Sequence, residues 1–162
     1  MEVFFENPVR KFHLRELSRF TRLSMPTIIS ATNTLHKEKM ILKHKSKAVT
    51  TVEANRENIQ FIRLKRAFNL EKTYVSTIVD YLTSAYNHPK AIIVFGSYSR
   101  GEDTEQSDVD IAVVTSKKAK LSLAPYEKIM KRKISIHEIE LDKVSAEFKN
   151  NLTNGIVLAG TL

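Results

Sequence analysis

Residues 91–114 read AIIVFGSYSRGEDTEQSDVDIAVV and predict two strands joined by a turn and a polar loop. The run Ala91–Phe95 is wholly apolar, which is typical of a buried strand. The second strand, 108–114, begins with Asp108 and Asp110. Because residues two apart on a strand point to the same face, about 7 Å apart along the backbone, these carboxylates are expected side by side. Their apolar neighbours are expected on the opposite, buried face: Val109, Ile111 and Val113.

Two carboxylates held on one strand repel each other unless a cation lies between them. Mg²⁺ (or Mn²⁺) takes oxygen ligands and usually keeps positions open for substrate phosphates. The pair Asp108 and Asp110 therefore predicts a metal site for phosphoryl or nucleotidyl chemistry. A solvated acidic strand end is the alternative explanation of the pair taken alone.

The turn between the strands predicts a phosphate site. Gly96 lets a phosphate approach the backbone closely, and Ser97 adds a hydroxyl. If a helix begins here, its N-terminal amides also favour an anion. Arg100 lies about one turn further on and can reach the same phosphates with its fork of donors. An ordinary Gly-Ser turn is the alternative.

Together, Gly96-Ser97, Arg100-Gly101 and Ser107-Asp108-Val109-Asp110 resemble the signature of the DNA polymerase beta-type nucleotidyltransferases. More narrowly, they resemble the minimal nucleotidyltransferases of prokaryotes. The resemblance covers residues 91–114 and implies that Gly96 and Ser97 hold the triphosphate of an NTP, expected to be ATP. It also implies that Asp108 and Asp110 are catalytic residues that bind divalent ions while a nucleoside monophosphate passes to a hydroxyl. Relatives often modify proteins, for example as antitoxins that adenylylate a helical toxin, so a protein acceptor is a hypothesis.

The family generally uses a third carboxylate on a later strand. The matching segment is 133–139, in which Ser135 and His137 are expected to face the aspartates, and neither is a carboxylate. Glu138 alternates to the other face unless a bulge turns it inward. All three are kept as possible third positions, with His137 as a base or ligand. Because a third carboxylate is not evident, a second hypothesis stays open: a DNA-binding regulator whose nucleotidyltransferase-like domain binds a nucleotide without efficient catalysis.

The rest of the C-terminal half predicts further elements of a mixed sheet with helices against it. A short helix is expected over 123–132, and Asp142 is expected to cap a helix that runs to about residue 150. An apolar segment follows over 152–159. The nucleotidyltransferase domain is therefore placed at residues 90–162.

The first 55 residues predict a helix, a turn, a second helix and a basic hairpin. The first helix covers 13–20. Ser24 is the expected N-cap of the second, with Pro26 just inside it, and the helix extends to about Lys39. Two strands, 40–44 and 48–52, flank residues 45–47. This order resembles a winged helix-turn-helix domain, with the second helix in the major groove of DNA and the hairpin as the wing.

That resemblance places three polar side chains at base edges, Thr27, Ser30 and Asn33, and three lysines on phosphates, Lys43, Lys45 and Lys47. The charge supports a duplex DNA partner, because the net +8 comes entirely from residues 1–90, with 16 Lys/Arg against 8 Asp/Glu. Residues 91–162 contain 10 of each. A module for protein contacts or homodimerisation is the alternative, since the second helix, which would be the recognition helix, carries no arginine. An autoregulating antitoxin, a repressor at one end and a modifying enzyme at the other, is a third hypothesis.

Residues 56–89 predict a helical connector with two apolar stripes, a break near Asn69 and an end at Pro89. The expected architecture is thus α+β: a winged helix-turn-helix over 1–55, a helical connector over 56–89, and a mixed β-sheet nucleotidyltransferase domain over 90–162. The chain has no cysteine, and no apolar run approaches the roughly 18 residues of a membrane span. We therefore expect a cytoplasmic protein without a membrane partner.

Overall fold

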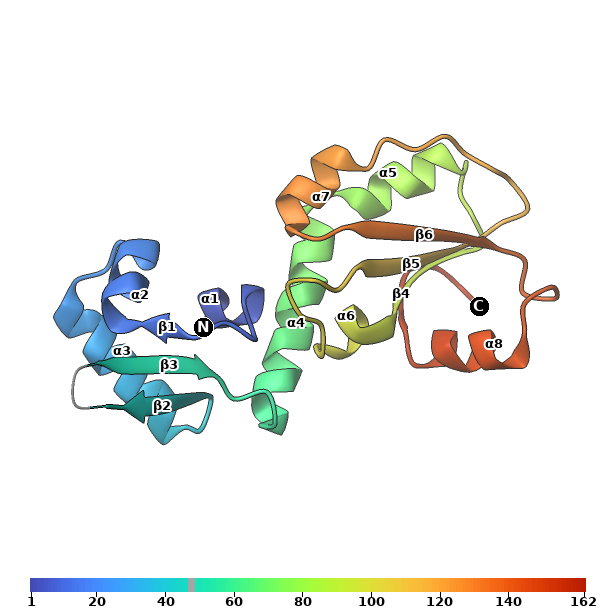
Figure 1. Ribbon diagram of the computed structural model, residues 1–162. Coiled ribbons are helices and arrows are strands. Elements are labelled where there is room, and N and C mark those ends of the chain that lie inside the picture. Colours follow the sequence, from blue (N-terminus) through green and yellow to red (C-terminus); the bar gives the residue numbers. More distant parts are fainter. Residues whose placement is uncertain (47–48) are drawn as a thin grey trace. The chain divides into compact units, whose positions relative to one another are not determined.

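The computed structural model describes residues 1–46 and 49–162, which form two compact units (Figure 1). The first unit comprises Met1–Lys65 and the second Arg66–Leu162. None of the described helices combines the length and the apolar character of a membrane-spanning segment.

The first unit contains a small antiparallel sheet in the order β1-β3-β2. The strands are β1 (Phe12–His13), β2 (Ile41–Lys45) and β3 (Thr50–Ala54), and the helices are α1 (Glu2–Glu6), α2 (Leu14–Thr21) and α3 (Met25–Lys37). The Ser24 hydroxyl accepts a hydrogen bond from the Thr27 amide at the start of α3, and Pro26 lies in the first turn. The predicted N-cap is therefore confirmed.

Aromatic side chains build the core of the first unit. The rings of Phe5 and Phe61 have centroids 5.2 Å apart, and those of Phe4 and Phe12 are 5.9 Å apart. Phe12 is fully buried and lies opposite Val52 where β1 pairs with β3. The hairpin places β3 two residues later than the sequence predicted, and α1 and β1 were not predicted.

The second unit is built on a four-stranded mixed sheet in the order β6-β5-β4-β7. The strands are β4 (Ala91–Phe95), β5 (Val109–Val114), β6 (Ile134–Ile139) and β7 (Ile156–Gly160). β4 runs antiparallel to both β5 and β7, whereas β5 and β6 are parallel. The prediction of a mixed sheet with helices is confirmed.

Helices cover the two faces of this sheet unequally. α5 (Ile78–Ala85) and α7 (Ala124–Met130) lie on one side, and α8 (Ala146–Thr153) lies on the other (Figure 1). The first face holds the larger apolar core, which includes Ile92, Ile111 and Val113. The second face packs a smaller cluster against α8. Part of the second face is thereby left for polar side chains.

Two predicted details of the helices are wrong. α4 (Ile59–Val75) continues through Asn69 and ends before Thr77, whose φ of 61° is left-handed. Asn69 is buried within the helix because its side chain bonds to Asp103 and to the Tyr98 carbonyl. The last helix, α8, is capped by Ser145 rather than Asp142, since the Ser145 hydroxyl accepts from the Phe148 amide.

Candidate active site

The pairing of β4 with β5 brings Gly96 against Asp110. Phe95 lies opposite Asp110 in the antiparallel register, so the residue that follows Phe95 meets the carboxylate. Gly96 has a φ of 74°, and a Cβ atom built on it would lie 2.8 Å from Asp110 Oδ2. Only glycine fits this backbone conformation and this approach without displacing the carboxylate.

Gly96 also begins the short helix α6 (Gly96–Arg100). Ser97 is half-buried in its first turn, and the Ser99 hydroxyl donates to the Gly96 carbonyl at 2.9 Å. The exposed Arg100 donates from Nε to Glu102 at 2.8 Å. In this structure Gly96 thus adjoins the aspartates, whereas Arg100 is paired with Glu102.

Asp108 directly precedes β5, and Asp110 lies within it. The interleaved residues Val109, Ile111 and Val113 are fully buried on the opposite face, as strand alternation predicts. Ser135 Oγ donates to Asp108 Oδ2 at 3.2 Å, and His137 Nε2 lies 3.3 Å from Asp110 Oδ1. The structure therefore brings Asp108, Asp110, Ser135 and His137 together with Gly96.

Glu138 lies on the other face of β6 and does not join this group. The β5–β6 register is regular from residue 134 to 139, without a bulge that would turn Glu138 inward. Its carboxylate accepts from the Tyr86 hydroxyl at 2.8 Å and from the Ala119 amide at 3.0 Å, and it pairs with Lys118 at 2.7 Å. Glu138 thus holds the loop after β5 against α5.

The donor set of the site fits a hard divalent cation. Mg²⁺ is commonly bound through one or two carboxylates and completes its octahedron with water and substrate phosphates. Asp108 and Asp110 would hold such an ion, and Ser135 and His137 lie beside them as hydrogen-bonding groups. Across residues 1–46 and 49–162, no three His, Cys, Asp or Glu side chains are grouped closely enough to form a complete metal site.

A buried polar network anchors the loop between α6 and β5. Asp103 is 1% exposed and accepts from Asn69 Nδ2 at 2.7 Å and from Arg132 Nη2 at 3.4 Å. Asn69 also donates to the Tyr98 carbonyl in α6 at 2.9 Å. These positioning residues were not predicted, because no local pattern links residues more than 25 positions apart.

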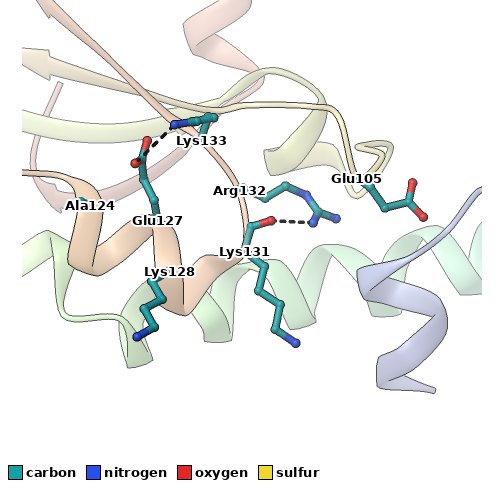
Figure 2. A pocket seen from close by; sticks show the side chains of 7 residues that line it. All are labelled: Glu105, Ala124, Glu127, Lys128, Lys131, Arg132 and Lys133. Carbon is teal, nitrogen blue, oxygen red and sulfur yellow. Dashed lines mark hydrogen bonds and ion pairs between the residues drawn. The ribbon is translucent and has the colours of Figure 1, made fainter. Parts of the chain in front are cut away.

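A cavity of about 450 Å³ lies where α7 ends and β6 begins (Figure 2). Figure 2 shows Lys128 and Lys131 extending to one side of it and the pair formed by Glu127 and Lys133 on the other. Its full lining is Glu105, Ala124, Glu127, Lys128, Lys131, Arg132 and Lys133. The excess of cations favours anions, and the basic run over 128–133, from which no site was predicted, could have indicated this cavity.

The predicted DNA-binding residues lie on α3 and β2 of the first unit. Asn33 on α3 accepts from Lys43 Nζ on β2 at 2.7 Å, so these two side chains engage each other. The Thr27 hydroxyl shares a hydrogen bond with the Ser24 hydroxyl at 2.8 Å. Ser30 and Lys45 are exposed, and Lys47 lies outside the described residues.

Comparison with known proteins agrees with this geometry. Residues 76–161 match the family model "Polymerase beta, Nucleotidyltransferase". A curated protein of Methanocaldococcus jannaschii, named "Putative protein adenylyltransferase", is 47% identical over 45 residues. That alignment covers 27% of this chain and 45% of the relative. No solved structure matches the chain significantly.

We predict that Glu138 stabilises the fold in a pH-dependent way. The Lys118 ammonium lowers the pKa of Glu138, the Ala119 amide and the Tyr86 hydroxyl add to this effect, and burial opposes it. A carboxyl with a lowered pKa contributes stability above its unfolded-state pKa and loses it as the pH falls through the folded-state pKa. Glu138→Gln should therefore lower the melting temperature at neutral pH and by a smaller margin at about pH 3.

Thermal unfolding of both proteins between about pH 7 and pH 3 measures this difference. Glu140→Gln, at an exposed position next to β6, is the matched control. A gap between parent and Glu138→Gln that is the same at every pH would contradict the prediction.

Proposed function

Because the chain belongs to the polymerase beta nucleotidyltransferase family over residues 76–161, we propose that it transfers a nucleoside monophosphate from an NTP to a hydroxyl acceptor. The observation that carries this proposal is the approach of Gly96 to Asp110, which unites a phosphate turn with a carboxylate pair. ATP is the proposed donor. The name of the archaeal relative, an adenylyltransferase, supports that choice.

In the proposed reaction, the acceptor oxygen forms a bond to the α-phosphorus of the NTP. The bond from the α-phosphorus to the bridging β-phosphate oxygen breaks, and pyrophosphate leaves. The hydroxyl proton passes to a base, for which His137 and water are the candidates. His137 lies beside Asp110, where the α-phosphate would sit.

The residues of the site divide these tasks. Gly96 and Ser97 bind the β- and γ-phosphates. Arg100 exchanges its hydrogen bond to Glu102 for hydrogen bonds to the same phosphates. Asp108 and Asp110 would hold Mg²⁺ or Mn²⁺, which when bound would neutralise charge on the α-phosphate and the leaving group. Ser135 and His137 orient the two carboxylates through their hydrogen bonds.

The proposed acceptor is a hydroxyl on a protein side chain. The curated relative is named as acting on protein, and the alignment covers 45% of its length. A toxin encoded beside this chain is one form of such an acceptor, and the chain would then act as its antitoxin. Modification of a protein in a lysate by labelled ATP, dependent on Asp110, tests this part.

We predict that Mg²⁺ or Mn²⁺ strengthens ATP binding and that Asp108→Ala or Asp110→Ala abolishes the metal effect. Either change removes one of the two ionised ligands of the site and half of its negative charge, so the protein no longer holds the cation firmly enough for the metal to strengthen ATP binding. Isothermal calorimetry with and without metal measures the effect. Asp80→Ala, which removes an exposed carboxylate on α5, should behave as the parent. An unchanged metal dependence in both site variants would rule out this site.

The third position generates a second prediction. Ser135 touches Asp108 where the family generally has a carboxylate, and a serine is a weak ligand and a poor base near neutral pH. Ser135→Asp should tighten the metal and raise pyrophosphate release from ATP, toward the roughly 100-fold that a positioned base supplies. Ser84→Asp, which adds the same charge at an exposed position on α5, is the control.

Pyrophosphate release also separates the enzyme from its alternative, a nucleotide-binding regulator without catalysis. Release from the parent above the rate of the Asp110→Ala variant supports the enzyme. If Ser135→Asp changes neither metal binding nor release, the assignment of Ser135 as the third position fails.

For the first unit we propose a winged helix-turn-helix that binds duplex DNA. The order of α2, α3 and the β2–β3 hairpin supports this interpretation. So does its charge, because residues 1–65 contain 13 Lys/Arg and 6 Asp/Glu. α3 would enter the major groove, and the bond from Lys43 to Asn33 would tie the wing to that helix.

We expect binding of the whole chain to duplex DNA to weaken steeply as salt rises. Replacing Lys43, Lys45 and Lys47 by Ala should reduce the slope of log K against log salt by about 1 for each DNA phosphate that a lysine no longer neutralises. Fluorescence anisotropy over a salt series measures that slope. Replacing Lys117, Lys120 and Lys149, all on the surface of the second unit, is the control. Absence of binding at low salt would make the first unit a protein-contact module.

A further inference from the structure

Three rings meet beside Asp110 on the face of the sheet that carries the site. Phe95 of β4 lies 5.2 Å from the His137 ring of β6 and 5.4 Å from the Phe148 ring of α8, centroid to centroid. The rings of His137 and Phe148 are 6.0 Å apart. Asp110 touches this cluster directly, because His137 Nε2 lies 3.3 Å from its carboxylate.

The three rings differ in their exposure. Phe95 is 7% exposed and belongs to the small core under α8. His137 has 38% of its side chain exposed, and Phe148 is half-buried against the same core. The cluster therefore has one buried inner ring, Phe95, and an outer ring pair, His137 and Phe148, that is partly exposed to solvent.

The geometry of the proposed reaction requires a surface for the nucleoside next to Asp110. With the terminal phosphates at Gly96 and Ser97 and the α-phosphate at the aspartates, the ribose and base must extend from the α-phosphate away from that turn. Along β5 beyond Asp110, the same face of the sheet leads to Ala112, which is fully buried and lies opposite His137 in the parallel register, so the exposed surface in this direction is that of His137 and Phe148. The outer ring pair thus lies next to the expected position of the sugar.

We propose that Phe148 and His137 form the nucleobase subsite, in which the base of the bound NTP stacks on the Phe148 ring and the His137 ring, tilted 51° to it, borders the base at its edge. This inference rests on the proposed nucleotidyl transfer and specifies the part of the substrate that the site recognises. Stacking on aromatic rings tolerates any base, because every base has a π face. Its strength grows with ring area, so the subsite favours purines over pyrimidines and does not distinguish adenine from guanine by its edges.

The experiment compares nucleotides with tripolyphosphate, which has the same phosphates and no nucleoside. Calorimetry in excess Mg²⁺ gives the Kd values of ATP, GTP, CTP, UTP and tripolyphosphate for the parent and for Phe148→Leu. Leucine keeps an apolar contact with Phe95 while removing the ring, and Phe148→Tyr retains the ring as a rescue. Tyr74→Leu, which removes an aromatic ring that is 48% exposed on α4, is the matched control. Melting temperatures confirm that each variant is folded.

We expect the parent to bind ATP and GTP several-fold more tightly than CTP and UTP. Phe148→Leu should raise the Kd of ATP and GTP by about tenfold and the Kd of the pyrimidine nucleotides by less. The Kd of tripolyphosphate should not change. Phe148→Tyr and Tyr74→Leu should retain the parent values. If Phe148→Leu loses affinity equally for ATP and tripolyphosphate, or loses affinity for neither, the subsite is overturned and the proposed transfer still stands. A parent that binds neither ATP nor tripolyphosphate would overturn both.

Discussion

The antiparallel register of β4 and β5 fixes where the glycine–serine turn meets the carboxylates of the candidate site. It places Phe95 opposite Asp110 and so brings Gly96 to the carboxylate. The register is itself fixed by the apolar face, because a slip of one residue would expose the fully buried Val109, Ile111 and Val113. Burying each such side chain is worth roughly 1.5–3 kcal/mol, far more than the polar contacts of the site. The hydrophobic core thus determines where the carboxylates lie.

The alternation of side chains between the two faces of a strand also decides which residues of β6 lie in the site and which stabilise the fold. Ser135 and His137 share a face with the aspartates, and both lie within hydrogen-bonding distance of them. Glu138 falls on the other face, where Lys118, Tyr86 and Ala119 engage it. A strand with only one carboxylate near its centre cannot supply both functions. With two carboxylates, the site would rely more heavily on water and on substrate phosphates to complete the ligands of a bound cation.

Local patterns were enough to predict much of the second unit. The apolar run of β4 and the alternation in β5 each give a strand and its buried face without outside information. Alternation along β6 also predicted that Ser135 and His137 face the aspartates, once β5 and β6 were assumed to be adjacent. Some of the features that escaped prediction depend on distant residues. The two-residue strand β1 has no periodicity of its own and exists because Phe12 pairs with Val52. The cap of α8 was misplaced because Asp142 and Ser145 are equally suitable N-cap residues and the sequence does not rank them.

Asn69 shows why the site extends beyond the segment that matches the family. A polar residue in the middle of a helix suggests a break, yet here it donates to the buried Asp103 and to the Tyr98 carbonyl. A buried carboxylate is costly unless charged and hydrogen-bonding groups surround it, and Arg132 supplies the charge. Through these contacts, α4 and the start of β6 both hold the loop between the glycine–serine turn and the aspartates. The register of β4 and β5 sets the two ends of that loop, whereas Asn69 and Arg132 set its middle. The orientation of α6 beside the carboxylates therefore depends on a helix that precedes the matched residues 76–161.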